Sequence, residues 1–220
     1  MKRSITALIN LVVLIVFSAG GMSAPESSAV TAAEARQKLM EGNKRYVAAR
    51  LLHPNQTARR RAEVAGSQHP FTAIVTCADS RVPPEILFDQ GLGDLFVIRL
   101  AGNILDDAVL ASLEYAVEHL GVKFIMVLGH ERCVAVETTL KGGETPGHIS
   151  SLVKTIQPAV DQAKKQAGDL LDNAVRANIS MVVQQLKSSV PILSECVRKG
   201  DLAVIGAYYD LDDGTVAMLP

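Results

Sequence analysis

The hydrophobic residues of this chain follow two different patterns. Four short runs are almost wholly apolar and rich in β-branched residues, at 71–76, 95–98, 124–128 and 202–207. Such runs are typical of strands buried on both faces of a sheet. Three longer stretches, at 106–120, 150–167 and 171–186, carry apolar residues every three or four positions and are predicted to be helices. Because strands and helices alternate, we expect an α/β fold with a mainly parallel central sheet flanked by helices.

Two further elements are predicted at the ends of this core. The stretch that begins at Thr31 has an amphipathic pattern, and Glu34 three residues later completes a capping box. We therefore expect an N-terminal helical arm. Near the other end, Asp213 and Gly214 form a turn signal before the apolar residues 215–219, which predicts a hairpin strand at one edge of the sheet.

The first 24 residues differ from the rest of the chain. Lys2 and Arg3 precede an apolar run over 5–17, and small residues follow up to Ala24. This order predicts a secretory signal peptide over 1–24, with an uncleaved N-terminal anchor as the alternative. The run is short for a membrane span. We expect a linker over 25–32, one catalytic domain over 33–220, export to the periplasm, and no membrane contact after cleavage.

Composition and charge narrow the class of protein. The chain has 220 residues, of which 48% are hydrophobic, which suits one well-cored globular domain. Its 22 basic and 23 acidic side chains give a formal net charge of −1. With no basic excess and no long basic run, a nucleic-acid partner is not expected.

The candidate chemistry follows two of the predicted strands. The strand at 71–76 leads into Cys77, and the strand at 124–128 leads into His130 and Cys133. Ligands collect at the carboxyl ends of parallel strands, so neighbouring strands would bring these three side chains together. Two thiolates and an imidazole suit zinc, and three protein ligands leave a fourth position open, as in catalytic sites.

Other interpretations of the cysteines remain open at this point. A buried cysteine is often only a small hydrophobic residue, and Cys77 and Cys133 can instead form a disulfide in an exported protein. The metal site is favoured because His130 accompanies one cysteine, while Asp79 and Arg81 accompany the other. The third cysteine, Cys196, lies in a helical pattern and is expected to be a buried structural thiol.

These motifs resemble the two signatures of the β-class carbonic anhydrases. The first matching segment is 77–84, and the second extends from 114–117 to 129–133. The similarity continues at 88–91, 99–103 and 206–210, so it covers essentially everything after residue 32. It implies a carbonate dehydratase, a carbon–oxygen lyase with one zinc ion per chain, that interconverts carbon dioxide and bicarbonate through a zinc-bound hydroxide.

The resemblance also implies a role for each matching residue. Cys77, His130 and Cys133 would be the zinc ligands. Asp79 would accept a hydrogen bond from the zinc-bound hydroxide, or become a conditional fourth ligand. Arg81 would pair with Asp79 and hold that carboxylate away from the metal.

Four residues are implied to contact the substrate. Gln68 matches a substrate-reaching glutamine, Phe96 and Tyr115 match positions that line a small apolar pocket, and Gly102 lies in a matching segment. Without the resemblance, Phe96 and Tyr115 would be assigned to core packing and Gln68 to a surface loop. In this family the active site lies at a subunit interface, so a homodimer or a higher even oligomer is implied.

The sequence departs from the family pattern in two places. Val134 stands where glycine usually follows the second cysteine, and its methyl groups are expected to crowd the site. The chain has no tryptophan, so the bicarbonate-inhibition site that uses tryptophan in some relatives is not expected in its usual form. Two alternative functions remain: a zinc hydrolase of carbon disulfide or carbonyl sulfide on the same fold, and a catalytically silent zinc- or bicarbonate-binding protein.

Overall fold

The computed structural model describes residues 30–220. The predicted signal peptide and most of the predicted linker therefore lie outside the described residues. In the described part of the chain, no helix is long and apolar enough to cross a membrane.

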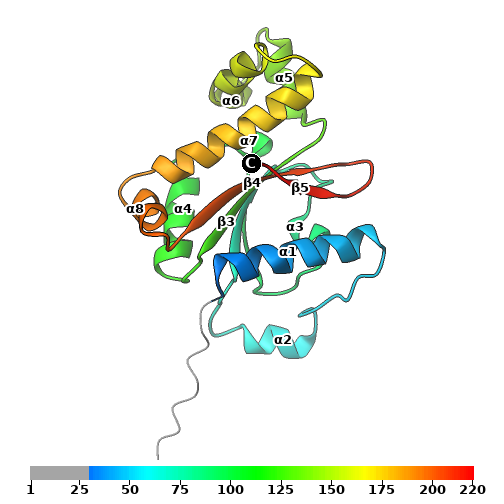
Figure 1. Ribbon diagram of the computed structural model, residues 1–220, viewed down its shortest axis with the longest axis vertical. Coiled ribbons are helices and arrows are strands. Elements are labelled where there is room, and N and C mark those ends of the chain that lie inside the picture. The colour runs from blue at the N-terminus through cyan, green and yellow to red at the C-terminus, as the bar shows by residue number, and fades with distance from the viewer. Residues whose placement is uncertain (1–29) are drawn as a thin grey trace, which may run out of the picture.

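A five-stranded sheet forms the centre of the molecule (Figure 1). Its spatial order is β2-β1-β3-β4-β5; the first four strands are parallel, and β5 pairs antiparallel with β4. The strands are β1 (Thr72–Thr76), β2 (Leu95–Arg99), β3 (Phe124–His130), β4 (Ala203–Tyr209) and β5 (Val216–Met218). All four predicted core strands and the C-terminal hairpin strand are confirmed.

Burial explains why these sequences form strands. Every residue of β1 and β3 is buried, as expected for apolar runs covered on both faces. By contrast, β2 lies at the edge of the sheet, and its residues are half-buried or exposed. The sheet therefore has a protected centre and an incompletely covered β2 edge.

Helices cover both faces of the sheet (Figure 1). They are α1 (Ala32–Val47), α2 (Ala58–Glu63), α3 (Pro84–Leu87), α4 (Asp107–Glu118), α5 (Val134–Lys141), α6 (Ile149–Ala163), α7 (Leu170–Ser188) and α8 (Ile192–Lys199), with a short 3₁₀ turn η1 (Ala101–Asn103). Alternate residues of β3 point to opposite layers. Ile125 and Val127 join the cluster under α4 to α8, whereas Met126 and Leu128 join the one under α1.

The N-terminal helix α1 begins as the sequence predicts. Thr31 Oγ1 accepts a hydrogen bond from the Glu34 backbone N–H, and the Glu34 carboxylate accepts one from the Thr31 backbone N–H. Further along α1, the buried Asn43 donates to the carbonyls of Leu87 and Gly214 and accepts from the Val216 N–H. Asn43 thus joins α1 to two distant parts of the chain.

Helix α7 lies close against the sheet because of a glycine in β3. A methyl group at Gly129 would approach Ile179 Cδ1 to 2.5 Å, so Ile179 would have to move to admit it. Ile179 is fully buried in α7. The absent side chain at 129 therefore sets the distance between this helix and β3.

Three short helices, α2, α3 and α5, were not predicted. In α5, Val134, Val136, Thr138 and Thr139 are β-branched, which lowers helix propensity, so packing against α6 decides its conformation. The expectation for Cys196 was also inaccurate, because its side chain in α8 is only half-buried.

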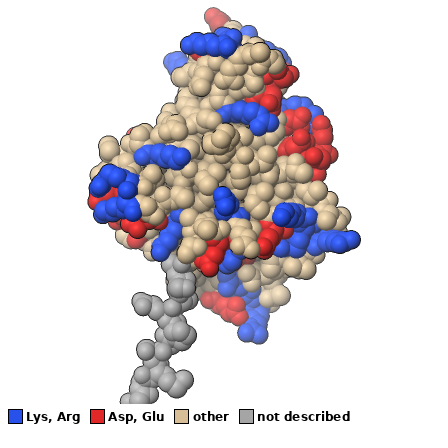
Figure 2. All heavy atoms as spheres, viewed as in Figure 1, with Lys and Arg blue, Asp and Glu red and all other residues tan. Residues whose placement is uncertain are grey.

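Charged residues are mixed in sign on the face shown in Figure 2. Basic and acidic side chains are both scattered among uncharged residues on this face (Figure 2).

Candidate metal centre

Two neighbouring strands carry the candidate site at their carboxyl ends. Strand β1 pairs directly with β3, with Thr76 opposite Leu128. The Thr76 hydroxyl also donates to the Leu128 carbonyl at 2.9 Å. Cys77 therefore leaves β1 beside the last residues of β3, as the sequence predicts.

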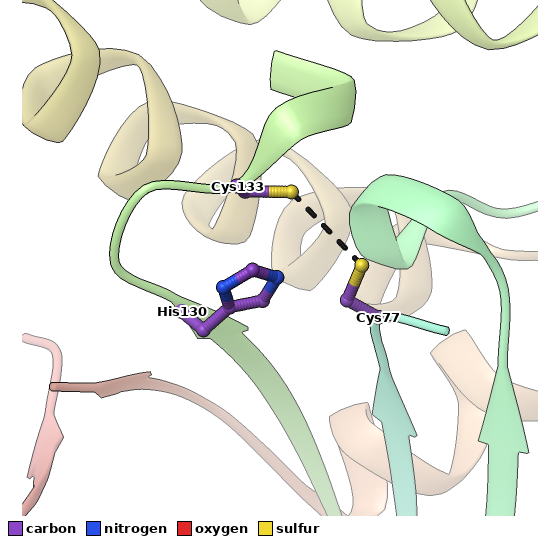
Figure 3. A group of neighbouring side chains, drawn as sticks. All are labelled: Cys77, His130 and Cys133. Carbon is purple, nitrogen blue, oxygen red and sulfur yellow. Dashed lines mark hydrogen bonds between the residues drawn. The ribbon is translucent and has the colours of Figure 1, made fainter. Parts of the chain in front are cut away.

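Cys77, His130 and Cys133 meet at this edge (Figure 3). One ligand atom from each lies within 4.8 Å of the others, and all three residues are buried. The two sulfur atoms are 4.0 Å apart, about twice the length of a disulfide bond (about 2.05 Å). Two thiolates on a tetrahedral zinc ion, with Zn–S bonds of about 2.3 Å, would be roughly 3.8 Å apart, so the spacing fits a shared ion.

The hydrogen bonding of His130 leaves its second nitrogen available for a metal. Nδ1 lies 2.8 Å from the Glu131 carbonyl oxygen, which can only accept, so Nδ1 carries the proton. Nε2 then has a free lone pair, yet it is buried and has no hydrogen-bond partner among the described residues. A buried acceptor without a partner is costly, and a metal ion at this position would satisfy it.

The two thiols influence each other strongly. The two thiols share a hydrogen bond in which either sulfur can be the donor. This bond, together with a contact to His130, lowers the pKa of Cys77 to about 4 despite its burial. The same hydrogen bond, together with burial, raises the pKa of Cys133. The pair therefore loses its first proton readily, as a thiolate ligand requires, while a metal ion would displace the second.

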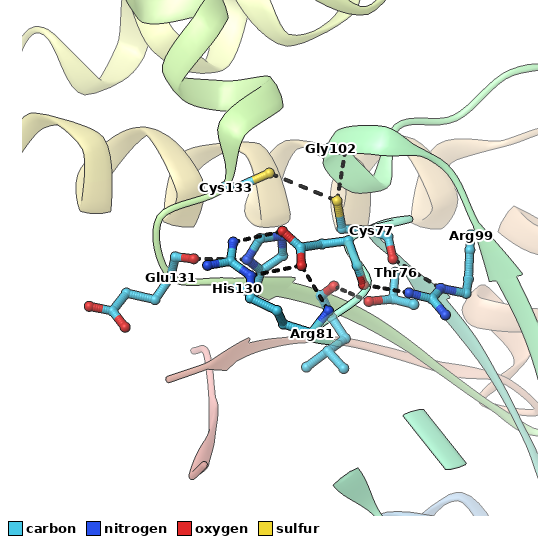
Figure 4. Close-up of polar contacts among 10 residues, drawn as sticks. Thr76, Cys77, Arg81, Arg99, Gly102, His130, Glu131 and Cys133 are labelled. Carbon is cyan, nitrogen blue, oxygen red and sulfur yellow. Dashed lines mark hydrogen bonds and ion pairs between the residues drawn. The ribbon is translucent and has the colours of Figure 1, made fainter. Parts of the chain in front are cut away.

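Arg81, labelled in Figure 4, forms an ion pair with Asp79 beside this group. Arg81 Nε is 2.9 Å from Asp79 Oδ1, and its terminal nitrogen is 2.7 Å from Oδ2, so the guanidinium binds both oxygens. The Arg81 hydrogen bonds lower the pKa of Asp79 to about 2, more than burial raises it. Asp79 Oδ2 lies 3.8 Å from His130 Nε2. A carboxylate is thus held, ionised, at the edge of the candidate metal position.

The Gly102 backbone also contacts the site. Its N–H donates to Cys77 Sγ at 3.3 Å (Figure 4). Gly102 has φ of +73°, and a methyl group there would come within 2.6 Å of Ile156 Cδ1. Only glycine fits this conformation and this space. Gly102, predicted to bind substrate, here touches the sulfur of a candidate zinc ligand.

Arg99 contacts the site without having been predicted to do so. From the end of β2, its Nε donates to the Cys77 carbonyl at 3.1 Å and its terminal nitrogen to the Asp79 carbonyl at 2.6 Å. Arg99 therefore braces the backbone between the two residues. It lies within the matching segment 99–103, but these contacts depend on the pairing of β1 with β2.

A mostly apolar cavity of about 390 Å³ opens beside Cys77 and Asp79. Its other lining residues are Ala78, Ala101, Val134, Ala135, Thr138, Ile149, Leu152 and Val153. Val134 does border this cavity, as expected, although 60% of its surface remains exposed. Ile149, Leu152 and Val153 of α6 were not predicted to line the cavity, because an amphipathic pattern does not reveal which apolar residues face a cavity.

The structure does not bring three predicted substrate residues to this cavity. Gln68 is exposed in the loop before β1, and Phe96 is half-buried on the edge strand β2. Tyr115 on α4 is 47% exposed, with its ring 5.1 Å from that of His119. All three are accessible at the surface of a single chain, and their substrate contacts stay predictions.

A second acidic group, Glu131, Asp210 and Asp212, lies nearby. Arg132 binds it, with nitrogens 3.2 Å from Glu131 and 2.6 Å from Asp212. Its charge is thus partly neutralised by an arginine rather than left available for a cation.

Comparison with known proteins identifies relatives over most of the chain. The family model described as carbonic anhydrase matches residues 72–216. Carbonic anhydrase 2 of Mycobacterium tuberculosis is 42% identical over 184 residues, which span 82% of this chain and 89% of that protein.

Solved structures give the same result. The β-carbonic anhydrase of Coccomyxa, in complex with acetazolamide, is 34% identical with a TM-score of 0.67, covering 72% of this chain and 75% of that one. A tetrameric β-carbonic anhydrase of Sordaria macrospora is 26% identical with a TM-score of 0.66, covering 72% and 84%. These relatives support neither of the two alternative functions, the hydrolase of carbon disulfide or carbonyl sulfide and the catalytically silent zinc- or bicarbonate-binding protein.

The sulfur geometry predicts three free thiols. After removal of metal, the denatured and unreduced chain should react with three equivalents of a thiol reagent, because Cys77 and Cys133 are not bonded. A value of one equivalent would mean that a disulfide joins them and would contradict the metal centre. Cys196→Ser, counted alongside, should give two.

Proposed function

The chain belongs to the β-class carbonic anhydrases, zinc-dependent lyases that reversibly hydrate carbon dioxide to bicarbonate and a proton, and we propose that Cys77, His130 and Cys133 hold its zinc. The observation that carries this proposal is the buried, unpartnered His130 Nε2 beside two sulfurs 4.0 Å apart. Three such donors and one ion per chain leave an open coordination position.

Zinc bound by these donors would supply a Lewis acid that lowers the pKa of water to about 7, a value known from carbonic anhydrases themselves. The surrounding residues prepare its ligands. The Glu131 carbonyl fixes the His130 tautomer, and the Gly102 N–H stabilises negative charge on Cys77. His130 and Cys77 are thus oriented before the metal arrives.

Arg81 determines what Asp79 can do. A free carboxylate beside the metal would compete for the open position, where a substrate or water must enter. The two-point contact with Arg81 engages both oxygens of Asp79 and restricts its rotation. We propose that Asp79 accepts a hydrogen bond from the attacking hydroxide, and that it becomes a fourth ligand only when Arg81 releases it.

The apolar cavity suits carbon dioxide, which is small and uncharged. The cavity offers it apolar contact from Ala101, Val134, Ile149, Leu152 and Val153. Placed there, the substrate lies beside both Cys77 and Asp79, so proximity supplies much of the rate gain. Val134 adds apolar surface where glycine is usual.

We propose that the chain works as a homodimer or a higher even oligomer. Support comes from the half-buried β2 edge and from the exposure of Gln68 and Tyr115, which would contact substrate across a subunit interface. The Sordaria relative is itself tetrameric.

We also propose that residues 1–24 direct export to the periplasm and are then removed, leaving a catalytic domain over 33–220. The basic start, apolar run and small residues of this segment support the proposal. Mass spectrometry of the protein from a Gram-negative host should find an N-terminus near residue 25 in the periplasmic fraction. An intact Met1 in the membrane fraction would indicate an anchor instead.

Purified protein is predicted to contain about one zinc per chain. Cys77→Ser should lose both the metal and the hydration activity, because a serine hydroxyl is a far weaker zinc ligand than a thiolate. Elemental analysis and stopped-flow hydration assays measure the two losses. Cys196→Ser is the matched control and should keep both, whereas full activity in a metal-free preparation would refute the proposed centre.

Arg81→Lys is predicted to lower kcat/KM for hydration by about tenfold. This is the effect expected when one charge-assisted hydrogen bond is lost. Lysine keeps the charge but not the two-point contact with Asp79. Arg176→Lys replaces another arginine that binds a carboxylate, Asp172 at 2.7 Å, and should leave the rate unchanged. If Arg81→Lys hydrated carbon dioxide with the same kcat/KM as Arg176→Lys, Arg81 would have no role in the mechanism.

Sedimentation of the wild-type chain should give the mass of a dimer or a larger even oligomer. Tyr115→Glu is predicted to shift this distribution towards monomers by placing a charge in the interface. Val190→Glu changes another exposed apolar residue, 78% exposed, and serves as the control. A monomeric wild type that is fully active would contradict the proposed assembly.

A further inference from the structure

We infer that Asn178 of α7 is a positioning residue for the metal centre, acting on the Cys77 sulfur through Gly102. The inference rests on the proposed zinc site and adds a residue to it that contacts neither metal nor substrate. Asn178 Nδ2 donates to the Gly102 carbonyl at 2.8 Å, and the Gly102 N–H donates to Cys77 Sγ at 3.3 Å.

These two hydrogen bonds hold the peptide groups on either side of the Gly102 Cα. One peptide group supplies the N–H that reaches sulfur, and the other supplies the carbonyl that Asn178 holds. Glycine has the widest conformational freedom of any residue, so a donor aimed from Gly102 needs an outside restraint. Asn178 provides that restraint from a different layer of the fold.

Space around Gly102 supports the same conclusion. A side chain there would collide with Ile156 and approach Ala135 Cβ to 3.2 Å, so the chain cannot stiffen this position by substitution. The left-handed backbone, with φ of +73°, likewise requires glycine. Rigidity must therefore come from a hydrogen-bond partner.

Asn178 itself is costly where it stands. It is 1% exposed in α7 among buried apolar residues such as Val175 and Ile179, and its Oδ1 has no hydrogen-bond partner among the described residues. An apolar side chain would pack there without leaving an amide oxygen unsatisfied. The one thing that Asn178 does and an apolar residue could not do is donate a hydrogen bond to the Gly102 carbonyl.

The consequence concerns the ligand rather than the fold. An N–H···S hydrogen bond draws electron density from a thiolate and fixes its direction. Outer contacts of this kind set how strongly a ligand binds its metal, and their loss typically costs 10- to 100-fold in metal affinity.

The test compares Asn178→Leu with the wild-type chain. The variant should bind zinc about tenfold more weakly in competition with a chelator, at the lower end of that range because Asn178 acts through Gly102. In cobalt-substituted protein, the sulfur-to-cobalt charge-transfer band should move to longer wavelength as Cys77 becomes more electron-rich.

Asn43→Leu is the matched control. Asn43 is also a buried asparagine that donates to backbone carbonyls, but it joins α1 to α3 and β5. Its loss should lower the melting temperature and leave both the cobalt band and the zinc affinity as in the wild type. A band shift in Asn43→Leu equal to that in Asn178→Leu would assign the effect to general loosening and overturn the inference.

The outcomes separate this inference from the proposed function. Zinc affinity and a cobalt band unchanged in Asn178→Leu would overturn the role of Asn178 while leaving the zinc site intact. If Asn178→Leu does not fold, Asn178→Ala decides by the same two measurements. A wild-type chain that binds neither metal would refute the zinc site, and the inference with it.

Discussion

The parallel pairing of β1 with β3 is the constraint on which the site depends. Cys77 lies 53 residues before His130 in the chain, and only this pairing brings the ends of their strands together. Both strands are buried along their whole length, so the hydrophobic effect that builds the core also fixes the ligand positions. The threonines of β1 add to this, since their hydroxyls donate to β3 carbonyls at both ends of β1.

Around that pairing, the site balances opposite charges at short range. The proposed metal site brings two sulfurs that must both be negative to ligate zinc, and Asp79 adds a third negative charge. Arg81 offsets the charge of Asp79 directly, while Arg99 and the Gly102 N–H place positive charge or hydrogen-bond donors against the same loop. The apolar cavity then begins where these polar contacts end. The apolar cavity and the ionic groups thus lie in adjoining but distinct surroundings.

Much of this arrangement could be predicted from the sequence, because it depends on local signals. Apolar runs located the strands, and the Thr31–Glu34 capping box located the start of α1. The motifs around Cys77 and Cys133 predicted that these two side chains and His130 meet. Helix α5 was missed because its β-branched residues disfavour helix until α6 packs on it. Arg99 and Asn178 were missed for another reason. Their partners are backbone carbonyls, brought within reach only by the tertiary fold, and a backbone carbonyl leaves no mark in a sequence.

The close approach of α7 to β3 has a consequence beyond stability. Gly129 permits it, Ile179 occupies the space, and the neighbouring Asn178 is thereby brought to the loop that carries Gly102. The volumes of the side chains at positions 129 and 179 thus affect the Cys77 sulfur, through Asn178 and Gly102. Substitutions that change side-chain volume between α7 and β3 would therefore be selected against for their effect on catalysis as well as on folding. The packing distance between this helix and this strand is thus a functional property of the protein.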